Sequence, residues 1–333
     1  MTGLKSSITA SAPGSLMLLG EHAVLHGRRA LVCAINQRIH VTINPAPGKI
    51  LRITSALGEY EAPLAALTDH PDFRFVLDAV KQYSPAQGIE LKIESDFPGD
   101  IGFGSSAAVT VATHAAFLES RRDAPVASPV RKERDGGVAS TLMEIFKRSL
   151  ATIRRVQGCG SGADAAASVF GGAVAYRAEP LEIQPLKEAF PFTAVYSGAK
   201  MKTADVIRHL DERRALNPGC FEKIFDRMDQ SVGAVMDDFS TLGENLILNQ
   251  KLMEEAGLCN AALAAIITEF AAQNIPAKIS GSGLGDCAIG LGEFPAPERF
   301  RAFPLQVSDS GVKTDKGTVG CESCSASPAP KLK

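Results

Sequence analysis

A glycine-rich segment in the first half of the sequence has the residue types of a phosphate-binding loop. Residues 97–110 read F-P-G-D-I-G-F-G-S-S-A-A-V-T, between an alternating, strand-like stretch at 89–94 and an apolar, helix-compatible stretch at 107–117. Glycines allow positive φ and let an anion approach the backbone, and free N–H groups at a helix start favour negative charge. Ser105 and Ser106 can cap this helix or bind a phosphate oxygen or its metal ion.

The same residues also fit a glycine turn with a serine cap, so this loop taken alone leaves both interpretations open. No lysine follows the last glycine, which excludes a Walker-type P-loop. The loop therefore predicts a nucleotide site of another architecture.

An acidic residue and a histidine follow the first apolar strand-like stretch. Residues 12–27 read A-P-G-S-L-M-L-L-G-E-H-A-V-L-H-G, with Glu21 and His22 directly after Gly20. Polar side chains at the end of a buried strand commonly face a cleft, where they would contact a substrate. The alternative is that the two residues only cap a turn.

Asp164 is the candidate general base. It ends the Gly/Ser segment G-C-G-S-G-A-D at 158–164 and precedes apolar residues that favour a helix. A carboxylate at a helix start often only complements the helix dipole. The same position suits a base that takes a proton from a substrate hydroxyl, so both roles stay open here.

A second glycine cluster lies near the end of the chain. Residues 278–291 read K-I-S-G-S-G-L-G-D-C-A-I-G-L, with three glycines between two strand-like stretches. They predict either a second concavity lined by backbone or a tight hairpin.

Composition limits the class of protein. The 333 residues, 45% of them hydrophobic, suffice for two domains or one large one. A formal charge of −2, 6% aromatic residues and no tryptophan argue against nucleic acid or an anionic membrane as partner. The seven cysteines are scattered and odd in number, and no apolar N-terminal run suggests a signal peptide or a membrane span. We therefore expect a cytoplasmic protein.

Strand-like and helical patterns are mixed along the chain. Strands are predicted at 7–12, 30–43 (as paired segments), 50–54, 170–177, 193–197, 277–280 and 286–291. Helices are predicted at 72–83, 107–117, 139–156, just after 164, 218–249 and 258–273. Between them, 121–137 is expected to be an exposed loop and 180–192 a domain crossover. The mixture favours an α+β fold over a doubly wound parallel sheet.

The four glycine-containing segments, in this order, resemble the GHMP kinases, small-molecule kinases named for galactose, homoserine, mevalonate and phosphomevalonate. The three family motifs match residues 12–27, 98–108 and 278–291, and the resemblance extends from about residue 7 to residue 312. G-E-H-A-V-L-H-G and G-S-G-A-D-A-A-A-S are most similar to mevalonate kinases. The third motif, which ends G-D-C-A-I-G-L, is similar to bacterial phosphomevalonate kinases.

The resemblance implies a two-domain α+β fold. A ribosomal protein S5-like, ATP-binding domain would span 1–182, a ferredoxin-like GHMP domain 183–312, and a disordered tail 313–333. ATP, with Mg²⁺, would phosphorylate the hydroxyl of mevalonate to give 5-phosphomevalonate between the domains. Phosphomevalonate as the acceptor and a ligand sensor without turnover are the alternatives, and a homodimer stays open.

Carried over to this chain, the resemblance also implies residue roles. The nucleotide phosphates would lie on five residues: Gly102, Gly104, Ser105, Ser106 and Ala107. Ser106 would also bind Mg²⁺, and Asp164 would orient or deprotonate the attacking hydroxyl. Substrate would be contacted by Glu21 and His22, with Gly281, Ser282 and Gly283 supporting the phosphate region.

Three positions depart from the family pattern. Ser15 stands where mevalonate kinases usually have lysine, so Asp164 is expected to be less biased toward its ionised form. Ile153 stands where the family has a metal-binding glutamate, and Asp100 stands within the glycine loop, where glycine is common. The residues proposed to supply a cation or to bind a phosphorylated acceptor are Arg28, Arg29, Lys200 and Lys202.

Overall fold

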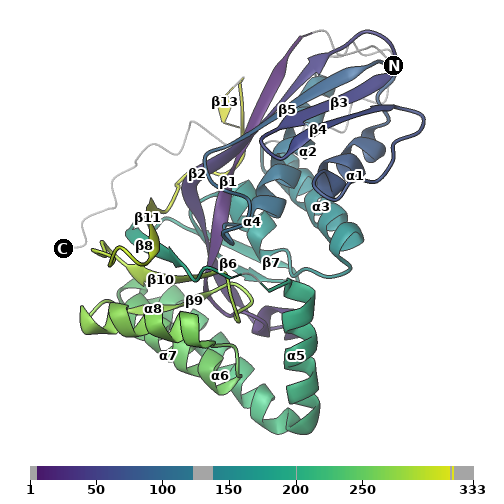
Figure 1. Cartoon of the computed structure of the whole chain (residues 1–333). Coiled ribbons are helices and arrows are strands. Elements are labelled where there is room, and N and C mark those ends of the chain that lie inside the picture. The colour runs from purple at the N-terminus through teal and green to yellow at the C-terminus, as the bar shows by residue number, and fades with distance from the viewer. Residues whose placement is uncertain (1–5, 123–137, 200, 316, 319–333) are drawn as a thin grey trace, which may run out of the picture.

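Two β-sheets organise the chain (Figure 1). The structure is a computed structural model that describes residues 6–122, 138–199, 201–315 and 317–318. Within these residues, the first sheet has the strand order β13-β12-β1-β2-β5-β3-β4, and β6 pairs with both β2 and β7. The second sheet has the order β11-β8-β10-β9.

The first sheet consists of β1 (Ile8–Leu19), β2 (Ala30–Pro45), β3 (Ile50–Ser55), β4 (Gly58–Pro63), β5 (Ile89–Ser95), β6 (Ala173–Arg177), β7 (Glu182–Leu186), β12 (Lys313–Thr314) and β13 (Gly317–Thr318). The second consists of β8 (Pro191–Tyr196), β9 (Ala277–Ser280), β10 (Cys287–Leu291) and β11 (Arg301–Gln306). The helices are α1 (Arg74–Tyr83), α2 (Ser105–Arg122), α3 (Val138–Gln157), α4 (Ala163–Phe170), α5 (Thr203–Leu216), α6 (Pro218–Asp237), α7 (Leu242–Glu255) and α8 (Ala261–Ala272), with short 3₁₀ turns η1 (Ala23–His26) and η3 (Phe239–Thr241).

Strand β1 lies in the first sheet between β12 and β2. Its residues are buried from Ala10 to Leu19, because helices α2 and α4 pack against it. In α4 the alanines at 165–167 are buried and bring the helix close to the strand. This packing places the end of β1 beside the first turns of α2 and α4.

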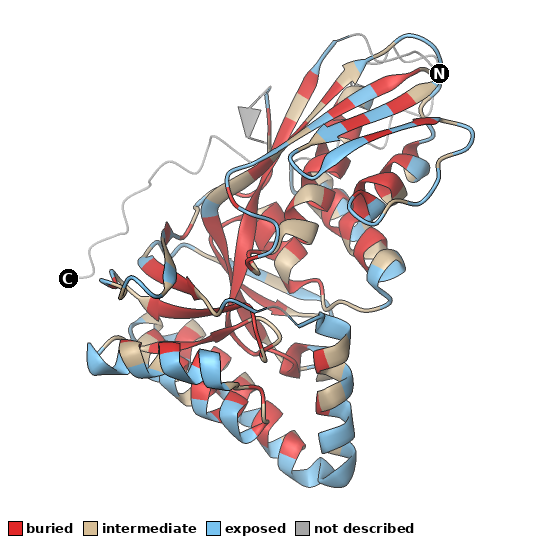
Figure 2. Ribbon diagram, viewed as in Figure 1, coloured by how far each residue is buried: buried red, intermediate tan, exposed pale blue. Residues whose placement is uncertain are grey.

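Helices α7 and α8 cover the second sheet by packing on β9 and β10. In Figure 2 the long helices show red inner faces and pale blue outer faces, as expected for amphipathic helices. Helix α6 also contacts η1 and β2, so it joins the second sheet's layer to the first sheet.

The α+β class is confirmed, and several element bounds are corrected. Residues 30–45 form one continuous strand instead of paired segments. The predicted helix 218–249 is interrupted at Asp238, which has extended φ and ψ and accepts a hydrogen bond from the Ser240 amide at 3.0 Å. Strands β4, β7 and β11 and helix α5 have no counterpart in the predicted elements. In α5 only Val206 and Leu210 are buried, which gives a weak helical pattern.

The predicted domain limits stay a prediction, but two segments near them are now placed. Strand β7 pairs with β6, so the first sheet extends to Leu186. Lys313 and Thr314 pair with Ser11 and Ala10, so the prediction of disorder from residue 313 is wrong at these positions. Residues 319–333 and most of the predicted loop 121–137 lie outside the described residues. In the part of the chain that the structure describes, no helix has the length and apolar character needed to cross a bilayer.

Candidate active site

Segments far apart in the sequence meet around one cavity of about 240 Å³. They are the end of β1 with η1, the glycine loop before α2, the loop before α4 and the loop between β9 and β10. Ten of the predicted site residues line it: Glu21, His22, Gly102, Gly104, Ser105, Ser106, Ala107, Asp164, Gly281 and Ser282. Gly283 is not among the lining residues, because it turns away and packs against Leu258.

The glycine loop fits tightly against its neighbours. Gly104 has φ of +67°, and a Cβ at this position would lie 2.1 Å from the Ser15 hydroxyl. Gly102 has φ of +80°, and a Cβ there would lie 2.9 Å from the Cβ of Asp286. Both conformation and space therefore require glycine, and the loop presents backbone to the cavity just before α2 begins.

An irregularity in β1 brings this loop and the strand together. The β1–β2 register shifts between Pro13 and Ser15, as at a β-bulge. A Cβ on Gly14 would lie 2.6 Å from the Phe103 carbonyl oxygen, and the Ser15 amide donates to that oxygen at 3.0 Å. The A-P-G-S segment thus directs Ser15 toward the cavity.

Ser15 in turn holds the carboxylate of Asp164. The Ser15 hydroxyl donates to Oδ1 of Asp164 at 2.8 Å, and Asp164 lies in the first turn of α4. Burial raises the pKa of Asp164, the Glu21 carboxylate raises it further, and the hydrogen bond from Ser15 opposes both effects. This is the direction expected for a site in which serine replaces the family lysine.

Glu21 forms a buried ion pair with the other sheet. Lys278 Nζ on β9 donates to Glu21 Oε1 and to the carbonyl of Ile279, and Asn249 on α7 donates to Glu21 Oε2 at 3.1 Å. Lys278 is fully buried and Glu21 is 2% exposed. Burial lowers the pKa of Lys278, while Glu21 opposes that shift. The glutamate is thus held by two elements of the second sheet's layer.

His22 is neutral and fixed in one tautomer. Its Nε2 lies 2.8 Å from the Ser282 carbonyl oxygen, which can only accept, so Nε2 carries the proton. Burial lowers the pKa of His22 below its ordinary value, which leaves Nδ1 unprotonated at neutral pH. Its backbone has φ of +58°, so the sharp turn into η1 sets the direction of the ring.

The cavity wall bears carboxylates but, among the described residues, no lysine or arginine. Asp286, in the left-handed conformation at φ of +60°, lies against Gly102. Ile153, where the resemblance led us to expect a metal-binding glutamate, is buried and contributes an apolar surface. Asp100 is exposed and does not line the cavity, so its charge faces solvent.

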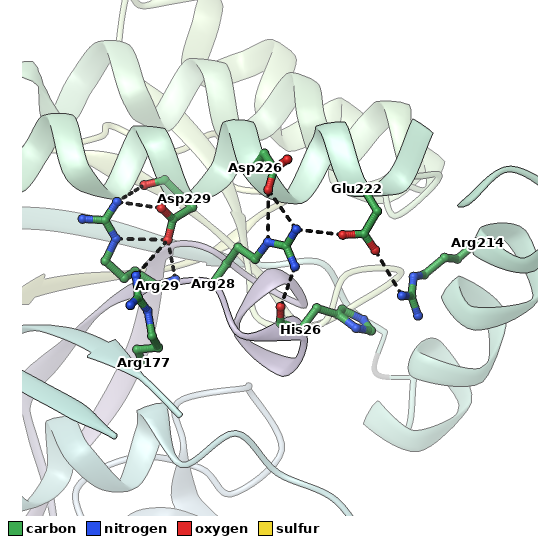
Figure 3. A network of polar contacts seen from close by, with 8 residues as sticks. All are labelled: His26, Arg28, Arg29, Arg177, Arg214, Glu222, Asp226 and Asp229. Atoms are coloured by element: carbon green, nitrogen blue, oxygen red, sulfur yellow. Dashed lines mark hydrogen bonds and ion pairs between the residues drawn. The ribbon is translucent and has the colours of Figure 1, made fainter. Parts of the chain in front are cut away.

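The arginines considered for a phosphorylated acceptor bind elsewhere (Figure 3). Arg28 donates to Glu222 at 2.7 Å and to Asp226 at 2.8 Å, and Arg29 donates to Asp229 at 2.6 Å. All three acids lie on α6. Lys202 is exposed at the start of α5, and Lys200 lies outside the described residues.

Comparisons with known proteins show the family of this chain. Residues 73–172 match the family model of the GHMP kinases N terminal domain, 231–304 that of the GHMP kinases C terminal domain, and 3–45 the galactokinase galactose-binding signature. The chain is 32% identical to a mevalonate kinase of Archaeoglobus fulgidus, over 92% of this chain and 99% of the relative. The chain belongs to the GHMP kinase family.

Solved structures share the GHMP kinase fold. The Lin0012 protein from Listeria innocua matches with a TM-score of 0.77 at 20% identity, over 94% of this chain and all of that one. The Methanococcus jannaschii mevalonate kinase matches with a TM-score of 0.72 at 20% identity, over 90% and 98%. These matches confirm the two-domain GHMP kinase fold.

Several features of the cavity were not predicted from the sequence. The Glu21–Lys278 pair was missed, although a lysine within the apolar strand A-K-I-S is a sign of a buried charge with a partner. Thr203 and Ile207 of α5 also line the cavity. Nothing in their local sequence distinguishes them from other helix residues.

Removing one partner of the buried pair is expected to destabilise the GHMP kinase strongly. Lys278→Met leaves the Glu21 carboxylate buried without its cation, which costs about 3–5 kcal/mol in the free energy of unfolding. Urea denaturation at pH 7 measures this, with Lys81→Met, at an exposed pair with Asp69, as the matched control expected to cost less than about 1 kcal/mol. Adding Glu21→Gln to Lys278→Met should recover part of the loss. Equal small effects for both lysines would contradict a structural role for the pair.

Proposed function

We propose that the chain is an ATP-dependent kinase that phosphorylates the hydroxyl of mevalonate to give 5-phosphomevalonate. The main support is that Asp164, held by Ser15, lines the same cavity as the glycine loop and the start of α2. The relative named mevalonate kinase, matched over nearly the full length of both chains, supports the same acceptor.

In this proposal the triphosphate lies on Gly102, Gly104 and residues 105–107, where backbone amides at the helix start favour anions. The donors near this loop are hydroxyl and carboxylate oxygens, which suit Mg²⁺. Ser106 would hold the ion together with the phosphates, since within the described residues no group of three or more His, Cys, Asp or Glu gathers as a metal site. Bound Mg²⁺ neutralises charge on the transferring phosphoryl group.

Asp164 would receive the proton of the acceptor hydroxyl. The hydroxyl oxygen then bonds to the γ-phosphorus, the bond from that phosphorus to the β,γ-bridging oxygen breaks, and ADP leaves. A raised pKa makes Asp164 a better proton acceptor as long as it stays ionised at the working pH. The Ser15 hydrogen bond favours the ionised form and holds the carboxylate in place.

The lining favours mevalonate over phosphomevalonate. A phosphorylated acceptor brings extra negative charge, yet no arginine or lysine lines the part of the cavity that is described. Arg28 and Arg29, the basic residues nearest in sequence to the first motif, form ion pairs with α6. A cytoplasmic location and a homodimer remain predictions from the sequence.

A coupled ADP-release assay tests the acceptor. We expect turnover with mevalonate and at least roughly a hundredfold lower kcat/KM with phosphomevalonate, galactose and homoserine, because binding differences of this size follow from unmatched charge or shape. Preference for phosphomevalonate would replace the proposed acceptor. Nucleotide binding without turnover of any of the four would instead support the sensor alternative.

Asp164→Asn is expected to lower kcat roughly 10²- to 10⁴-fold, because the amide cannot accept the hydroxyl proton. The variant keeps the shape of the side chain and a carbonyl oxygen for the Ser15 hydrogen bond, so ATP affinity should change less than about twofold. ADP release gives kcat, and calorimetric titration with a non-hydrolysable ATP analogue gives the affinity. Unchanged turnover would remove Asp164 from the mechanism.

Ser15→Ala should move the acidic limb of the pH profile of kcat/KM to higher pH. The Ser15 hydroxyl lowers the pKa of Asp164, so its loss raises that pKa and activity disappears at a less acidic pH as pH falls. Ser280→Ala is the control, since its hydroxyl also lines the cavity but donates to the Met17 carbonyl. A limb that stays in place, or moves to lower pH, would show that Ser15 does not act on the catalytic carboxylate.

A further inference from the structure

Part of the cavity wall comes from two elements outside the glycine loops. Val24 and Leu25 belong to η1, and Thr203 and Ile207 belong to α5. Resting on the proposed function, which places the phosphates on the glycine loop, this wall is where the acceptor's carbon chain would lie. The spacing between η1 and α5 then determines how well the acceptor fits.

Helix α5 has few apolar contacts that could fix its position. Only Val206 and Leu210 are buried among its 14 residues. Most of the stability of a protein helix comes from packing of an apolar face, so a helix with two buried side chains depends on polar contacts for its placement. At its last turn, Arg214 donates to Glu222 of α6 at 3.1 Å.

Arg28 connects this contact to η1 (Figure 3). One guanidinium nitrogen of Arg28 donates to the His26 carbonyl in η1 at 2.7 Å, and another donates to Glu222 at 2.7 Å. Glu222 therefore binds Arg28 through one oxygen and Arg214 through the other. The His26 ring also stacks on Phe225 of α6, with centroids 4.6 Å apart.

We propose that Arg28 is a positioning residue for the acceptor: it acts through Glu222 and Arg214 to hold α5 against η1. The planar guanidinium can serve η1 and α6 at the same time, which a single-point cation cannot do as well. The side chains of Arg28 and Glu222 are 26% and 39% exposed, so each ion pair of Glu222 contributes little by itself. The position of α5 therefore depends on the contacts of Arg28, Glu222 and Arg214 acting together.

The test uses Arg28→Met, which keeps the apolar stem, and Glu222→Gln, which keeps the size of the side chain. Each is expected to raise the KM for mevalonate roughly three- to tenfold, while the KM for ATP stays within about twofold. Because both act through one chain of contacts, the double variant should be little worse than the single ones. Hydrogen exchange at residues 203–216 should become faster in all three, with α8 unchanged.

Arg52→Met is the matched control, since Arg52 pairs with Glu61 on the β3–β4 hairpin away from the cavity. It should change neither KM nor exchange in α5. Arg28→Lys should keep part of the acceptor affinity that Arg28→Met loses, because lysine keeps the positive charge but lacks the planar guanidinium group.

An unchanged KM for mevalonate together with unchanged exchange in α5 would overturn the inference, as would an equal rise in both KM values. If wild-type protein turns over no mevalonate, the proposed function fails. The exchange of α5 in Arg28→Met then decides by itself whether Arg28 positions this helix.

Discussion

Close approach of the glycine loop to strand β1 determines the geometry of the active site. Ser15 binds the loop through its amide and Asp164 through its hydroxyl, so one residue connects the proposed phosphate site with the proposed base. This is possible only because Gly14 and Gly104 leave room where any Cβ would collide. The bulge in β1 and the glycines of the loop are therefore both needed to place Ser15 between the loop and Asp164.

The carboxylates of the site are buried or partly buried, and among the described residues no lysine or arginine lines the cavity beside them. Glu21 is balanced by Lys278, so the pair ties the two sheets together without adding net charge. The Ser15 hydroxyl that binds Asp164 is neutral, and burial raises the pKa of this carboxyl although the hydrogen bond opposes the rise. A GHMP kinase with lysine at position 15 would favour the ionised carboxylate by charge, whereas this chain favours it through a hydrogen bond.

The sequence predicted the parts of the site that depend on local chemistry. Glycines, serines and a carboxylate at a helix start have short-range signatures, and the resemblance to the GHMP motifs assigned them to a site, so ten lining residues could be named in advance. The α+β class followed from the mixture of strand and helix patterns. The Glu21–Lys278 pair was not predicted, because its members are 257 positions apart and the lysine in an apolar strand does not by itself identify its partner. Helix α5 was not predicted for a different reason: its two buried residues give almost no amphipathic pattern. The long strand at 30–45 and the break at Asp238 depend on neighbours that the local pattern does not contain.

After β11, the chain returns to the sheet in which it began. Residues near 307–311 pass beside Ala34 and Gly172, and β12 then adds to the edge of β1. In topology, the second sheet with its helices is thus an insertion within the first. A cut between the two halves would separate β1 from its own edge strand, so the lobes of this kinase are not independent modules joined end to end. A chimera that exchanges one lobe between two relatives would need two junctions, because the chain passes between the lobes twice.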